Sequence, residues 1–139
     1  MDRAEALRRI GDERVARLAT IGSDGPHLVP VVFAFDGGRV VTAVDQKPKR
    51  TRDLQRLKNI VADPRVSLLA DRYDDDWSRL WWVRVDGTAR IVRTGAEFVE
   101  VLALLADKYQ QYRSDPPRGP AIVIEVGRVA WWSAEPPRV

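Results

Sequence analysis

Apolar and polar residues follow one another in short blocks along the chain, and these blocks predict a mainly β protein. Runs rich in β-branched and aromatic residues are separated by turn signals, which is typical of strands joined by hairpins. Pro30 interrupts one otherwise buried strand, so a bulge or a sheet edge is expected there, because proline has no N–H to donate. Asp86-Gly87 is expected to bend or bulge the longest strand. The predicted strands cover residues 15–21, 28–35, 39–44, 66–70, 80–92, 121–126 and 128–132.

Other segments repeat their apolar residues at helical spacing. The first begins at Asp2-x-x-Glu5, which resembles a capping box. The second covers residues 51–62 and ends at Asp63-Pro64, and the third covers residues 95–109. Strands joined mostly by hairpins, with a few helices inserted, predict one closed or partly closed antiparallel β-barrel domain over residues 1–139. A Rossmann fold is not expected, since the chain has no Gly-x-Gly-x-x-Gly.

The composition is that of a globular domain, with 45% apolar and 31% charged residues. No apolar run approaches the roughly 18 residues that cross a bilayer, and the first residues lack the layout of a signal peptide. We therefore expect a cytoplasmic protein without a membrane partner. The chain has no cysteine and a single histidine, His27, which argues against disulfides, thiol nucleophiles and a metal centre.

Positive charge is concentrated in one part of the chain. The whole chain carries a net charge of +3, whereas the window 47–58 alone carries +5, so the remainder is mildly acidic. A local cluster of this kind indicates a discrete anion site rather than a surface that coats nucleic acid, and no nucleic-acid partner is expected. Arg56 and Lys58, which lie further along the predicted helix, are assigned to the surface.

The first part of this basic window has the features of a phosphate-binding site. Lys47, Lys49 and Arg50 follow the end of a predicted strand, and a helix is expected to begin at Thr51. A helix N-terminus presents unpaired N–H groups and a partial positive charge, which favour a phosphate. Thr51 can cap the helix and also donate its hydroxyl to the anion. The alternative is a solvated basic loop, and the residues alone do not decide between the two.

The tryptophans form a second conspicuous group. Neighbouring residues of a strand face opposite sides of the sheet, so one member of Trp81-Trp82 can enter the core while the other faces outward. An outward indole needs a ring system, another subunit or water as its neighbour. A core or interface role is favoured over ring stacking for at least three of the five tryptophans, which are Trp77, Trp81, Trp82, Trp131 and Trp132. The serines show no nucleophile-elbow context, so a cofactor would perform the difficult chemistry of an enzyme built on this chain.

A series of short motifs in a fixed order runs through most of the chain. They are Leu18-Ala19-Thr20-Ile21, Asp24-Gly25-Pro26, Phe35-Asp36, the segment Lys47 to Leu54, the segment Asp63 to Leu68, Asp76-Trp77-Ser78, Val85-Asp86-Gly87, Lys108-Tyr109, Gln111-Tyr112, Pro116-Pro117 and Ala130-Trp131-Trp132-Ser133. In this order they resemble the pyridoxamine 5′-phosphate oxidase-like split-barrel superfamily, and in particular its branch of oxidoreductases that depend on the deazaflavin coenzyme F420.

This resemblance implies an antiparallel split β-barrel of the FMN-binding type, assembled as a homodimer with two cofactor sites at the subunit interface. The cofactor phosphate would be held by Lys47, Lys49 and Arg50, with Thr51 nearby. The cofactor ring would lie along the strands that contain Pro30, Val31, Val32, Thr42, Ala43 and Val44. Residues near Trp77 and Trp82, contributed by the partner chain, would close the site.

The activity implied by the resemblance is hydride transfer from reduced F420 to an electron-poor small molecule. The FMN enzymes of the superfamily carry polar or basic side chains on the second barrel strand and an Arg-Lys pair in the loop. Here the strand is Val29-Pro30-Val31-Val32-Phe33 and the loop has Lys49-Arg50, which favours the deazaflavin over FMN. Two alternatives stay open: an FMN-dependent oxidoreductase or FMN-binding protein, and a cofactor carrier without turnover. No catalytic acid or base is assigned, and solvent can supply the final proton.

Overall fold

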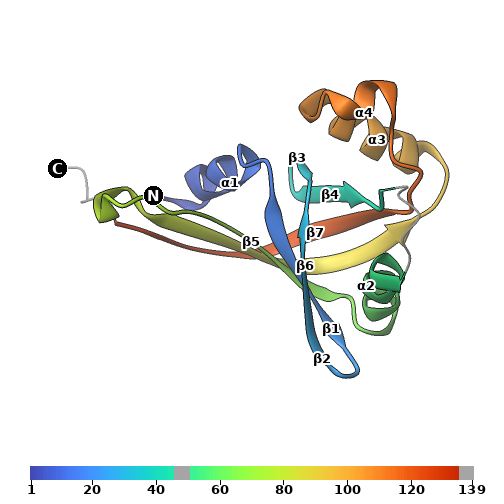
Figure 1. The fold of residues 1–139 in the computed structure, drawn as a ribbon, viewed down its shortest axis with the longest axis horizontal. Helices are drawn as coiled ribbons and strands as arrows, with labels where there is room; N and C mark the ends of the chain where they lie inside the picture. The colour runs from blue at the N-terminus through green and yellow to red at the C-terminus, as the bar shows by residue number, and fades with distance from the viewer. Residues whose placement is uncertain (46–50, 135–139) are drawn as a thin grey trace.

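The computed structural model describes residues 1–45 and 51–134 of the chain, and for residues 51–54 only the backbone. Within these residues, seven strands form one antiparallel sheet in the order β2-β1-β5-β6-β7-β4-β3 (Figure 1). The strands are β1 (Ala16–Gly22), β2 (Gly25–Val31), β3 (Ala34–Asp36), β4 (Arg39–Ala43), β5 (Arg65–Arg72), β6 (Trp81–Val92) and β7 (Ala121–Ser133). The predicted mainly β, antiparallel fold is confirmed.

Among the described residues, helices occur at the three predicted places and at one further place. They are α1 (Arg3–Gly11), α2 (Thr51–Ala62), α3 (Ala96–Lys108) and α4 (Gln111–Ser114), with a short 3-10 turn, η1, over Trp77–Arg79. The carboxylate of Asp2 accepts a hydrogen bond of 2.9 Å from the backbone N–H of Glu5, as the predicted N-terminal cap requires. Helix α4 was not predicted, because four residues are too few to show a helical period. Across the described residues, no helix is both long and apolar enough for a bilayer span.

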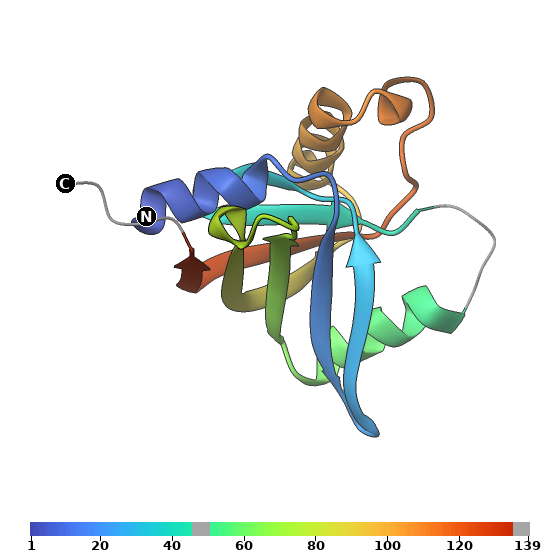
Figure 2. The same cartoon turned by 60° about the vertical axis from the view of Figure 1, so that its left-hand side comes forward.

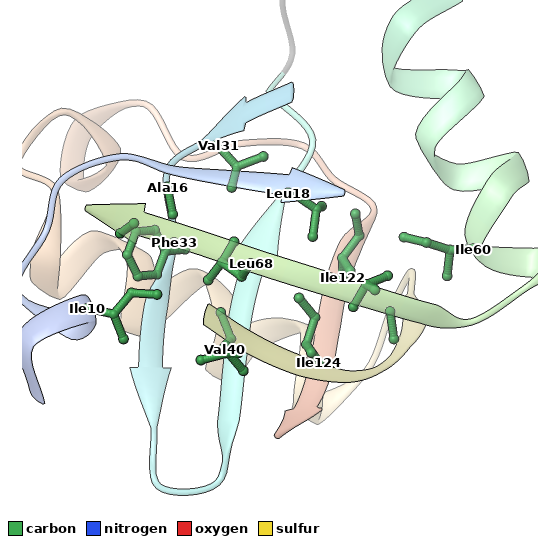
Figure 3. Packing of buried hydrophobic residues seen from close by; sticks show 14 of the residues in the cluster. Ile10, Ala16, Leu18, Val31, Phe33, Val40, Ile60, Leu68, Ile122 and Ile124 are labelled. Atoms are coloured by element: carbon green, nitrogen blue, oxygen red, sulfur yellow. The ribbon is translucent and has the colours of Figure 1, made fainter. Parts of the chain in front are cut away.

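The sheet bends around one apolar core, which gives the split-barrel architecture. Leu18, Leu68 and Ile122 come from β1, β5 and β7, and all three are at most 1% exposed. Figure 3 shows these side chains converging, with Ile10 of α1 and Ile60 of α2 at the margins of the cluster. Strands from both halves of the sheet therefore share one interior.

Helix α3 covers part of the outer surface of the barrel. Its Val101 and Leu105 are fully buried against Val41 of β4 and Val123 of β7. Figure 1 shows α3 and α4 on the same side of the molecule, next to β4. The other helices leave the outer faces of β1, β2 and β5 uncovered, and Leu28 is 65% exposed there.

The pairing of β6 with β7 contains the predicted irregularity. The register shifts between Asp86 and Gly87, so the expected bulge is confirmed. On the other strand, Arg128 pairs with Asp86 and Val126 with Gly87, which leaves Gly127 as the extra residue. The prediction of separate strands over 121–126 and 128–132 was wrong, because β7 continues through the bulge.

The prediction of one buried strand over residues 28–35 was wrong. Strand β2 ends at Val31 and β3 begins at Ala34, so the run is divided between two strands at opposite ends of the sheet order. Burial alternates along β2, because only one face of this part of the antiparallel sheet packs against the core. Pro30 lies in this edge strand, as its missing N–H predicted.

Candidate functional site

A cleft of about 340 Å³ lies where the end of β2 meets β4. Figure 2 shows the arrowhead of β2 beside β4. The cleft brings together Pro30, Val31, Val32, Thr42 and Ala43, which are five of the six residues predicted to lie along the cofactor ring. Its other lining residues are Val29, Asp45, Arg56 and Tyr112.

The sixth predicted ring residue, Val44, does not line this cleft. Its side chain is 9% exposed and packs in the barrel core. Its backbone N–H donates to the carbonyl of Pro120 at 2.9 Å, and its carbonyl accepts from the N–H of Gly119 at 3.3 Å. Val44 follows the last residue of β4, and its side chain packs among the buried residues of the barrel core rather than at the cleft.

The side chains predicted to hold the phosphate are not among those that the structure describes. Lys47, Lys49 and Arg50 lie outside the described residues. Helix α2 begins at Thr51, as predicted, and the side chain of Thr51 is likewise outside the description. Asp45 lines the cleft and immediately precedes this segment in the chain. The phosphate-binding role of these residues stays a prediction.

Side-chain hydrogen bonds hold the wall of the cleft where the strand ladder stops. The hydroxyl of Thr42 donates to the carbonyl of Val32 at 2.6 Å, which joins β4 to the end of β2. The backbone N–H of Phe33 donates to the hydroxyl oxygen of Tyr109 at 3.1 Å. That hydroxyl lies 3.0 Å from the Phe33 carbonyl and 2.8 Å from the Arg14 carbonyl. These bonds satisfy backbone groups that the missing strand pairing would leave free.

Lys108, the last residue of α3, contacts the segment before β1 and the residue Phe33. Its Nζ donates to the Glu13 carbonyl at 2.7 Å and lies 3.9 Å from the centre of the Phe33 ring. Burial lowers the pKa of Lys108 to about 8, and the positive charge of Arg14 acts in the same direction. Helix α3 is therefore tied to the segment before β1 and to the wall of the cleft.

The polar part of the cleft contains residues that sequence reasoning did not select. Arg56 is only 7% exposed, so its assignment to the surface was wrong, whereas Lys58 is exposed as predicted. Burial raises the pKa of Tyr112, and the negative charge of Asp45 raises it further. Helical spacing places Arg56 on the same face as Ile60, four positions later, but only the structure shows that this face is buried.

Trp77 and Trp82 are not brought to this cleft within the chain. Trp77 is 68% exposed in η1, and Trp82 pairs with Trp132 across β6 and β7. Neither lines the cleft, and their contribution from a partner chain stays a prediction.

Comparison with known families agrees with this architecture. The model of the family described as Pyridoxamine 5′-phosphate oxidase matches residues 3–133. The chain belongs to the pyridoxamine 5′-phosphate oxidase family. The family resemblance of the sequence motifs is thereby confirmed. No curated protein matches the chain.

Solved structures show the same pyridoxamine 5′-phosphate oxidase-like fold. A conserved hypothetical protein from Mycobacterium tuberculosis is 26% identical, with a TM-score of 0.78 over 96% of this chain and 86% of that one. A FAD-binding protein from Mesorhizobium loti is 17% identical, with a TM-score of 0.73 over 94% of both chains. A heme binding protein from Mycobacterium smegmatis is 25% identical, with a TM-score of 0.72 over 92% of this chain and 52% of that one.

Proposed function

We propose that this protein is an oxidoreductase that uses reduced coenzyme F420 to transfer hydride to an electron-poor small molecule. The observation that carries the proposal is the cleft between β2 and β4. One wall contains Val31 at the end of β2, Val32, which follows that strand, and Ala43 of β4. The buried Arg56 lies in the same cleft. The chain leads from Asp45 in this cleft directly into its most basic segment.

The residues present fit such a cofactor. A planar tricyclic ring needs an apolar surface, and the lining of the cleft offers apolar residues that include Pro30, Val31 and Val32. The cleft, at about 340 Å³, falls within the range of small-molecule sites. The phosphate-bearing tail needs positive charge, which Lys49 and Arg50 supply in the segment that follows Asp45.

Each part of the chain then has a defined task. When bound, reduced F420 supplies a hydride at C5 of its ring. The strands orient the ring and keep water from one of its faces, while the basic residues bind the phosphate. Proline at position 30 presents no N–H to a ligand along that part of the wall. Solvent supplies the proton that completes reduction of the substrate.

The proposal includes a homodimer, in which a second copy closes the open side of the cleft. Trp77 and Trp82 of the partner subunit would cover the bound ring. The outer face of the sheet supports this arrangement, since Leu28 is 65% and Leu69 is 38% exposed there.

FMN is the second candidate cofactor. A solved structure of the same fold, 17% identical to this chain, is described as a FAD-binding protein. A carrier that binds the cofactor without turnover is the third reading, because no side chain has an assigned acid or base role.

Side-by-side titration of the purified protein with F420 and with FMN tests the proposal. We expect F420 to bind at least about tenfold more tightly than FMN. Replacing Lys49 and Arg50 together by Ala should weaken F420 binding by about tenfold or more, because charged hydrogen bonds to the phosphate are lost. The control removes Arg8 and Arg93, two exposed arginines, and should leave the affinity unchanged.

If FMN binds more tightly than F420, FMN is the cofactor. If neither binds, the proposal is overturned. Steady-state oxidation of reduced F420 with quinones, enones and tetrapyrroles then separates an enzyme from a carrier. Turnover of at least one acceptor class is expected, whereas tight binding without turnover indicates the carrier.

A further inference from the structure

Helix α2 turns an arginine toward the interior. Arg56 is 7% exposed, and Asn59 and Ile60, which follow it by three and four positions, are 4% and 3% exposed. These spacings place the three residues on one face of the helix. Lys58 is exposed, and Val61 is 75% exposed, so the opposite face is in solvent. A cation thus occupies the face that usually holds only apolar side chains.

Contacts of Asn59 and Ile60 with the barrel fix the rotation of helix α2 about its own axis. The amide Nδ2 of Asn59 donates to the hydroxyl of Thr20 in β1 at 3.0 Å, and both residues are buried. The side chain of Gln55 donates to Oδ1 of Asn59 at 2.8 Å. Ile60 packs in the barrel core. With the helix held in this rotation, Arg56 lines the cleft one turn before Asn59.

The described lining of the cleft contains one cation and one carboxylate, Arg56 and Asp45. The Thr42 hydroxyl already donates its proton to the Val32 carbonyl, so it can only accept from a ligand. Arg56 interacts with other groups of the protein, but a guanidinium carries five N–H donors in a planar fork. Such a fork can bind an oxyanion while it keeps other contacts.

We infer that Arg56 binds an oxyanion of the ligand held between β2 and β4 and thereby determines which ligands the cleft accepts. The inference deepens the proposed function and rests on it. Burying a guanidinium beside a mostly apolar wall costs free energy that an apolar residue would not cost. A fixed cation that faces a cleft attracts an anionic group that enters it, through donors beyond those it uses within the protein. The oxyanion is a phosphate of the cofactor or a carboxylate of the substrate.

Three variants of the full chain test the inference. Arg56→Met removes the charge at similar length, Arg56→Lys keeps the charge without the fork, and Lys58→Met is the control on the exposed face of the same helix. We expect Arg56→Met to weaken F420 or FMN binding by about tenfold or more, Arg56→Lys to weaken it less, and Lys58→Met to leave it unchanged.

A second readout does not depend on the cofactor. Titration of the wild-type protein with inorganic phosphate should shift the Arg56 Nε–Hε resonance in ¹H–¹⁵N NMR spectra, which Arg56→Met identifies by its disappearance. Isothermal titration calorimetry measures phosphate binding by the wild type and by Arg56→Met. Weaker binding of both cofactor and phosphate in Arg56→Met assigns the oxyanion to the cofactor, and weaker binding of phosphate alone assigns it to the substrate. If neither binding changes, and the resonance does not move, the inference is overturned. If the wild type binds neither F420 nor FMN while the resonance still shifts, the proposed function fails and the oxyanion site stands.

Discussion

Asn59 is the buried amide that joins helix α2 to the barrel. Its Nδ2 donates to the Thr20 hydroxyl at 3.0 Å, and Thr20 is 2% exposed. We expect Asn59→Ala to lower the free energy of unfolding by about 1–3 kcal/mol, because the buried hydroxyl loses its donor. Urea unfolding monitored by tryptophan fluorescence measures the change, with Lys58→Ala as the exposed control.

The pair also allows a compensation test. Thr20→Val combined with Asn59→Leu removes both polar groups, so the double variant should be more stable than Asn59→Ala alone. An Asn59→Ala protein as stable as the wild type would show that this hydrogen bond does not hold the helix.

Lys108 links stability to alkaline pH. Its pKa falls from 10.5 in the unfolded chain to about 8 in the folded protein, chiefly through burial. Between these values the unfolded state binds more protons than the folded state, so the free energy of unfolding should rise from pH 8 to pH 9.5. Above this window tyrosine ionisation opposes the trend, since burial raises the pKa of Tyr109 and Tyr112 in the folded protein.

Urea denaturation at several pH values between 7 and 10 measures this slope. Lys108→Met should make the profile flatter over the same window, while replacing the exposed Lys58 by Met should leave it unchanged. A wild-type profile that falls steadily from pH 8 upward would contradict the assignment to Lys108.

At the scale of elements, the bulge between β6 and β7 depends on glycine. A Cβ atom at Gly87 would collide with the backbone carbonyl of Glu125 and would lie 2.8 Å from Cγ2 of Ile124. The backbone of a central strand pair cannot move away without breaking ladder hydrogen bonds. We therefore expect Gly87→Ala to destabilise the protein by about 1–3 kcal/mol or more, as measured by thermal or urea unfolding.

Gly38→Ala is the matched control for this substitution. Gly38 lies in the turn before β4 and has no positive φ. A Cβ atom at this position would have no other atom within 4 Å apart from those of its chain neighbours. Its replacement should change stability little. Equal stability of the two alanine variants would mean that the bulge shifts to accommodate a side chain.

At the scale of the whole molecule, the uncovered outer face of the sheet is the surface on which a second copy would pack. Leu69 pairs with Arg17, and Leu28 pairs with Ala19, so all four side chains share this face. We expect a dimer in sedimentation velocity, and we expect Leu69→Glu to shift it toward monomer and to weaken F420 binding, because the charge would be buried in the interface.

Val99→Glu is the control for this change. Val99 is 65% exposed on α3, away from the β1–β5 face, so the substitution should leave both assembly and binding unchanged. A wild-type protein that sediments as a monomer while binding F420 normally would contradict the role of the second copy.

Local signals were enough to predict most elements. Helix α2 covers 51–62 as expected, because apolar spacing and Asp63-Pro64 act over a few residues. The bulge at Asp86-Gly87 and the edge position of Pro30 were also predictable, since each follows from the chemistry of one or two residues. The family resemblance predicted six residues along the cofactor ring, and five of them line one cleft.

The remaining features depend on which surfaces meet in three dimensions. The apolar segment 28–35 was predicted to be one buried strand, but it is divided between two strands. Its burial depends on neighbours that are distant in sequence. Val44 lies in the core and Arg56 in the cleft for this reason, since each is placed by the packing of a whole element. Local chemistry therefore determined the elements and the residue types available for binding, whereas long-range packing decided which of them share a cleft.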